Sequence, residues 1–135
     1  MNRILLAAAL LAALTAFIHL FAGGADVVAP LLASSLPPMP KLTLYAAWHM
    51  ASATLILSSA ALFIGSLPQH AIRSAYLVLF VSLLWIVFGA VFLIVGLTQP
   101  DSGGWLHLPQ WTLLLPVGAL GLWGGCPACR QRPAA

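Results

Sequence analysis

The stretch Lys41–Leu67, KLTLYAAWHMASATLILSSAALFIGSL, decides the fold class of this chain. It is mostly apolar and exceeds the roughly 20 residues that a helix needs to cross a bilayer. At helical spacing a narrow polar stripe runs along it, made of Tyr45, His49, Ser52, Ser59 and Ser66. Lipid offers such side chains no hydrogen-bond partner, so the stripe should face other helices or water. We therefore expect one wall of a membrane helix bundle, with His49 as its most consequential residue.

The composition of the whole chain supports the membrane assignment. Of its 135 residues, 62% are hydrophobic and only 5% are charged, whereas soluble domains carry about 25% charged residues. The net charge of +3 comes from five cations that are scattered among apolar runs. Because nucleic-acid binding needs clustered basic residues, we expect no nucleic-acid partner. The expected partner is the lipid bilayer.

Three further apolar runs accompany the opening stretch. The predicted fold is all-α, a single domain forming a polytopic transmembrane four-helix bundle, with spans near 4–21, 42–67, 72–97 and 108–123. The predicted external loops are 24–40 and 98–107. The first loop holds four prolines, which argue against a long regular helix, and its apolar residues make it a candidate lid or a connector packed on the bundle.

The positions of the cations predict the orientation of the spans. With the N-terminus inside, four of the five cations lie on the cytoplasmic side, namely Arg3, Arg73, Arg130 and Arg132. Only Lys41 then lies outside. We therefore expect a multi-pass protein of the cell inner membrane with both termini cytoplasmic.

The first apolar run has features of a signal peptide, because a basic start precedes it and small residues follow it. Its apolar part is longer than the usual 7–15 residues, which favours an uncleaved signal-anchor helix over a cleaved signal peptide. Ala8, Ala12, Thr15 and His19 share one face of this helix, and its small residues should pack closely on the rest of the bundle.

The predicted topology places acids and imidazoles on the outer side. Asp26 and Asp101 are the only acids, and His19, His49 and His107 lie toward the same side. Imidazole and carboxylate ligands suit a divalent transition metal, so these five residues form a candidate metal site. No two ligands share a helix at metal-binding spacing, so such a site would depend on tertiary contacts. Haem ligation by His19 and His49 is a weaker alternative, because the two lie at different depths.

A small lipophilic ligand such as a quinone is the other candidate for this outward-facing pocket. Tyr45, Ser52 and Trp85 would line it beside the imidazoles. The competing interpretation is structural: a neutral His49 would be hydrogen-bonded to Ser52, Thr15 or a carbonyl and so hold two helices together. His19 would likewise serve helix packing. Whether the chain is an enzyme is left open.

The tail carries a CxxC pair, Cys126 and Cys129. The pair and the helix count resemble the membrane thiol oxidoreductases of the disulfide-bond-B and vitamin-K-reductase type, and the resemblance implies thiol redox chemistry with a quinone. In those families the pair faces the oxidising side and further cysteines take part, whereas here the charge rule places the pair inside and the chain has no other cysteine. A cytoplasmic role in thiol redox or metal handover is therefore carried as an alternative function.

Glycines on two helices provide a third alternative. Gly89 and Gly96 share a face of one span, and Gly121 and Gly125 share a face of another. Such smooth faces let a second helix approach closely. The chain could therefore be a non-catalytic membrane subunit or scaffold that packs on a partner protein or on another copy of itself.

Overall fold

The computed structural model describes residues 1–99, 106 and 108–126. Throughout these residues the regular structure is helical, with no strand. The elements in order are α1 (Arg3–Gly23), η1 (Gly24–Val28), α2 (Ala29–Ala33), α3 (Pro38–Ser66), η2 (Pro68–His70), α4 (Ala75–Thr98) and α5 (Trp111–Gly125). The prediction of an all-helical chain with four apolar helices is confirmed.

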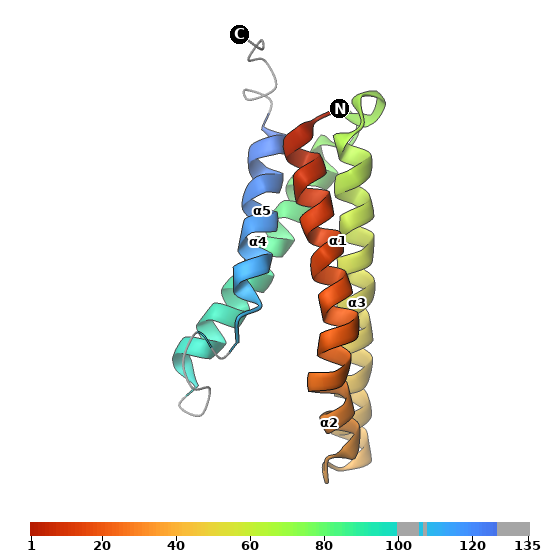
Figure 1. Ribbon diagram of the computed structural model, residues 1–135, viewed down its shortest axis with the longest axis vertical. Coiled ribbons are helices and arrows are strands. Elements are labelled where there is room, and N and C mark those ends of the chain that lie inside the picture. The colour runs from red at the N-terminus through yellow and green to blue at the C-terminus, as the bar shows by residue number, and fades with distance from the viewer. Residues whose placement is uncertain (100–105, 107, 127–135) are drawn as a thin grey trace.

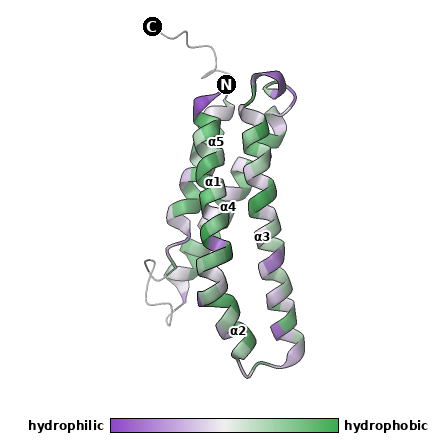
Figure 2. Cartoon of the chain, turned by 45° about the vertical axis from the view of Figure 1, so that its right-hand side comes forward, coloured by the Kyte–Doolittle hydropathy of each residue, from purple (hydrophilic) through white to green (hydrophobic). Residues whose placement is uncertain are grey.

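Three stretches of helix are long and apolar enough to cross a membrane. They are Arg3–Ala33, Pro38–Ser66 and Ala75–Thr98, while the fourth apolar helix, α5, has only 15 residues. Most residues of the helices are hydrophobic (Figure 2). Many large apolar side chains are exposed, for example Phe17, Phe80 and Leu57. A surface of this kind is typical of helices that face lipid.

The helices form two antiparallel pairs, α1 with α3 and α4 with α5 (Figure 1). Helix α5 also packs along α1 and so joins the pairs, while α3 and α4 contact each other far less. The α4–α5 pair leans away from α1 and α3 toward the end of the molecule that holds α2 (Figure 1). The N-terminus, the turn between α3 and α4 and the end of α5 lie together at the opposite end.

Small residues bring α1 into the core. Its buried residues include Ala8, Ala12 and Thr15, as the shared face in the sequence predicted. Leu5 and Ala16 extend the same face, and the remaining core is made by apolar residues of the other helices: Leu55, Leu62, Val78, Val81, Trp85, Leu114 and Val117. Because this face is buried from Leu5 to Ala16, the first helix is an integral part of the described fold.

The structure corrects the predicted loop at 24–40. Helix continues through η1 and α2 as far as Ala33, and α3 already begins at Pro38. Two features accommodate the prolines. Pro38 and Pro40 lie in the first turn of α3, where a missing N–H costs nothing. Pro30 follows a π-helical turn, in which the Ala29 N–H donates to the carbonyl of Gly24, five residues earlier. This turn is wider than an α-helical turn and so gives the side chain of Pro30 space.

This segment therefore extends the line of α1 beside α3 and does not fold across the helices as a lid (Figure 1). Lys41 secures the short connection, since its ammonium donates to the carbonyls of Ser34 at 2.6 Å and Leu32 at 3.3 Å. A cation at a helix C-terminus also complements the helix dipole there. Lys41 and the two described arginines, Arg3 and Arg73, thus lie at opposite ends of the molecule (Figure 1).

Candidate functional site

Five residues of α1 and α3 come together where the sequence predicted a pocket. This imidazole cluster consists of His19, Tyr45, Trp48, His49 and Ser52. His19 comes from α1 and the other four come from α3. At 1.5 Å per residue, His19 lies about 24 Å along α1 from Arg3, which places the cluster toward the end of the helix pair that carries α2.

His19 is held by two contacts with α3. Its ring stacks on the Trp48 indole with centroids 4.5 Å apart and planes 17° from parallel. Its Nε2 lies 3.0 Å from the Ser52 hydroxyl. The Ser52 hydroxyl has one hydrogen, and it donates this hydrogen to the Trp48 carbonyl at 2.9 Å. In its contact with His19 the hydroxyl must therefore be the acceptor, so Nε2 of His19 carries the hydrogen. His19 therefore links α1 to α3 through Ser52, a partner that the sequence analysis had considered for His49.

His49 lies on a different face of α3 and is exposed. The predicted stripe is only partly buried: Ser52 and Ser66 are buried, whereas Tyr45 and Ser59 are half-buried. The buried face of α3 is rotated from that stripe because Leu55, Ser58 and Leu62 also pack inward, and the rotation turns His49 outward. Of the two environments expected for the stripe, other helices or water, His49 therefore does not have the first.

The ring of His49 nevertheless belongs to the cluster. Tyr45 meets it edge to face with centroids 4.5 Å apart, and Trp48 does so at 5.3 Å. No hydrogen bond to another described residue engages its ring nitrogens. Trp48 therefore contacts both imidazoles, since it is stacked with His19 and nearly perpendicular to His49. Sequence analysis missed Trp48, although its position four residues before Ser52 and next to His49 was a usable signal.

The other predicted metal ligands are not gathered here. Asp26 lies exposed in η1, while Asp101 and His107 fall outside the described residues. Among the residues that are described, no three His, Cys, Asp or Glu side chains converge on one point. A metal site built from His19, His49 and one carboxylate stays a prediction that depends on Asp101 or on ligands from elsewhere.

Trp85 and the thiol pair lie apart from the imidazole cluster. Trp85 is 1% exposed and is part of the core on α4, and no ring contact or hydrogen bond among the described residues links it to His19 or His49. Cys126 is half-buried at the end of α5, at the opposite end of the molecule. Cys129 falls outside the described residues, so the geometry of the CxxC pair stays untested.

Three of the four glycines proposed for partner binding, Gly89, Gly121 and Gly125, face other parts of the chain. A side chain at Gly89 would meet Leu115, one at Gly121 would meet Ser82, and one at Gly125 would meet Val78. These positions therefore serve the packing of α4 against α5.

Asn2 is a second residue that the sequence analysis missed. Its side-chain oxygen caps α1 by accepting from the N–H groups of Ile4 at 3.1 Å and Leu5 at 3.2 Å. Its amide nitrogen donates to the Gly124 carbonyl at 2.8 Å, and its backbone N–H donates to the Ser66 carbonyl at 2.8 Å. One residue thus joins the start of α1 to the ends of α3 and α5. An N-cap residue directly before a long apolar run was the available signal.

No protein-family model, curated protein or solved structure matches this chain.

Proposed function

We propose that this chain is a multi-pass protein of the cell inner membrane with both termini on the cytoplasmic side. Three helices of spanning length and an exposed apolar surface support insertion. The hydrogen bond from Asn2 to Gly124 supports an even number of crossings, because it holds the start of α1 and the end of α5 at the same end. Arg3 and Arg73 gather at that end, as the positive-inside rule requires of a cytoplasmic face.

Reporter fusions check this orientation. A phosphatase that is active only outside and a fluorescent protein that folds only inside, each fused after Cys126, should give a strong fluorescent signal and no phosphatase signal. The same pair of reporters inserted after Ser35, between α2 and α3, should give the reverse result. Phosphatase activity from the fusion after Cys126 would refute the proposed sidedness.

We propose that the imidazole cluster binds a small lipophilic ring compound such as a quinone. The observation that carries this proposal is the contrast between the two histidines. His19 is fixed by Ser52 and Trp48, whereas His49 is exposed with ring nitrogens that no described residue engages. A ring could lie along Tyr45 and Trp48, and the His49 N–H could donate to its carbonyl oxygen. An ionisable group at membrane depth with unused hydrogen-bonding capacity is a reasonable focus for a binding site.

Substitution of His49 tests this site. Purified protein titrated with a short-tailed quinone should show quenching of tryptophan fluorescence, since Trp48 would touch the ring. His49→Leu should weaken the affinity about tenfold, the loss expected for one hydrogen bond of about 1.4 kcal/mol. His70→Leu is the matched control, because His70 is exposed at the other end of the molecule. Equal affinity in all three proteins would reject the site.

The same preparation separates the alternative functions. Elemental analysis and an absorption spectrum report any bound metal or haem. A transition metal that disappears in His49→Leu would favour the metal site over the quinone. A protein with neither ligand that co-purifies with a defined membrane complex would favour the scaffold function. Reaction of Cys126 and Cys129 with thiol reagents only from the cytoplasmic side would fit the thiol redox alternative.

A further inference from the structure

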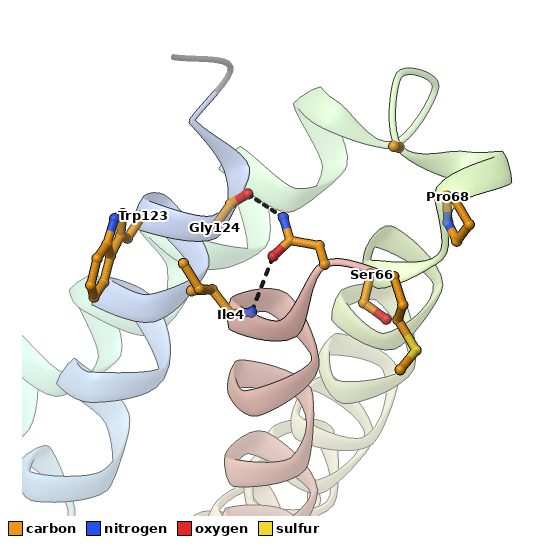
Figure 3. A pocket seen from close by; sticks show the side chains of 8 residues that line it. Ile4, Ser66, Pro68, Trp123 and Gly124 are labelled. Atoms are coloured by element: carbon orange, nitrogen blue, oxygen red, sulfur yellow. Dashed lines mark hydrogen bonds between the residues drawn. The ribbon is translucent and has the colours of Figure 1, made fainter. Parts of the chain in front are cut away.

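A pocket of about 400 Å³ lies at the end of the molecule opposite to α2. Its wall is formed by the start of α1, the turn after α3 and the end of α5, and includes Asn2, Ile4, Ser66, Pro68, Trp123 and Gly124. Figure 3 shows Trp123 on one side and Ser66 and Pro68 on the other, with Ile4 and Gly124 between them. The volume falls within the range of about 300–1,000 Å³ that is typical of small-ligand sites.

The charges around this pocket are all positive among the described residues. Arg3 lies between the lining residues Asn2 and Ile4, and Arg73 lies two positions after the lining residue Ala71. Both arginines are exposed, and neither has an ion pair in the described part of the chain. The one acid in that part, Asp26, lies at the far end near α2. The guanidinium groups are therefore available to an anion from outside the chain.

The polar side chains that line the pocket, Asn2 and Ser66, already form hydrogen bonds within the chain. Asn2 uses its side chain on Ile4, Leu5 and Gly124, and the Ser66 hydroxyl donates to the Phe63 carbonyl at 2.7 Å. The side chains of Asn2 and Ser66 therefore offer little to an anion, which would need the cations that neighbour the lining in sequence, Arg3 and Arg73. Guanidinium groups suit phosphate because their planar N–H pairs match two of its oxygens.

Trp123 gives the pocket the character of a membrane interface. Trp123 lies in the last turn of the apolar helix α5 and lines the pocket, and its side chain is 60% exposed. Tryptophan is favoured at the headgroup level, where its ring contacts acyl chains and its N–H meets polar groups. A site with an interfacial tryptophan and nearby arginines has two of the features that favour binding of an anionic lipid.

We propose that this pocket binds the headgroup of an anionic phospholipid of the cytoplasmic leaflet. The phosphate would pair with Arg3 and Arg73, the polar head would enter the pocket beside Ile4, and the acyl chains would run past Trp123 along the apolar helices. Basic pockets between helices on the cytoplasmic side are known to hold such headgroups. The proposal rests on the membrane orientation proposed above and is independent of the quinone site.

Lipid titration of the full chain in neutral detergent tests this site, with native mass spectrometry as the readout. Short-chain phosphatidylglycerol should be retained at least tenfold more strongly than phosphatidylcholine of the same chain length. Arg73→Gln should weaken phosphatidylglycerol binding about fivefold, the effect of one basic residue at a membrane surface. Lys41→Gln, which removes a charge at the other end, should leave it unchanged.

Two further experiments test whether binding requires the pocket and whether the ligand is a lipid and not free phosphate. Ile4→Trp keeps every charge but fills the pocket, so it should abolish the preference for phosphatidylglycerol. Circular dichroism confirms that the variant is folded. If Ile4→Trp binds as well as the parent, or if Arg73→Gln and Lys41→Gln behave alike, the proposed site is wrong. Displacement of the lipid by millimolar inorganic phosphate would show a free-phosphate site and would also overturn the proposal. Because the assay is done in detergent, it can fail without affecting the reporter-fusion result.

Discussion

Gly118→Ala should destabilise the protein by about 1–3 kcal/mol, the usual cost of forcing extra atoms into a packed core. A methyl group at this position would lie 2.8 Å from the backbone oxygen of Ser82 and 2.7 Å from Ile86. The Ser82 carbonyl belongs to the α4 backbone, so the clash can be relieved only by moving α4 away from α5. Reversible unfolding of the purified protein in mixed micelles measures the change in free energy.

Two variants serve as controls for this prediction. Gly24→Ala makes the same chemical change where no atom lies within 4 Å, so it should be neutral or stabilise by up to about 1 kcal/mol through helix propensity. Gly121→Ala should also destabilise, but its methyl group meets the side chain of Ser82. Adding Ser82→Ala should therefore partly rescue Gly121→Ala and should not rescue Gly118→Ala. Similar stabilities for the Gly118 and Gly24 variants would contradict the close packing of α4 on α5.

Asn2→Ala should lower the free energy of unfolding by about 2 kcal/mol. Loss of an N-cap costs about 1 kcal/mol, and loss of the bond to the Gly124 carbonyl adds about 1 kcal/mol more. The backbone bond from Asn2 to Ser66 would remain. Thermal unfolding followed by circular dichroism measures the effect.

Asn2→Asp separates the two contributions. Aspartate caps a helix as well as asparagine does, but its carboxylate cannot donate to the Gly124 carbonyl. The variant should therefore keep the cap, lose the link to α5 and fall between the parent and Asn2→Ala. If Asn2→Asp were as stable as the parent, the link between α1 and α5 through this side chain would contribute nothing.

Part of the imidazole cluster followed from the sequence and part did not. His19, Tyr45, His49 and Ser52 were identified from their polarity within apolar helices, and His19 was correctly placed on the face of α1 that carries Ala8, Ala12 and Thr15. The exposure of His49 did not follow from the sequence, which left the stripe facing either other helices or water. A polar stripe shows that a helix has a polar face. Which face packs against the other helices depends on the shape of those helices. Here α1 packs on the side of α3 that carries Leu55 and Leu62.

The sequence by itself determined the helical class and the three long apolar helices, because hydrophobic length and composition are properties of a local stretch of chain. It also determined which face of α1 is buried, since small residues at helical spacing are a local pattern. The tertiary structure was needed to show that Trp48 contacts both imidazoles, that Asn2 joins three helix ends, and that Gly89, Gly121 and Gly125 pack within the chain. Each of these depends on residues far apart in sequence meeting in space, and the relative rotation and tilt of packed helices are set by the fit of all their side chains together.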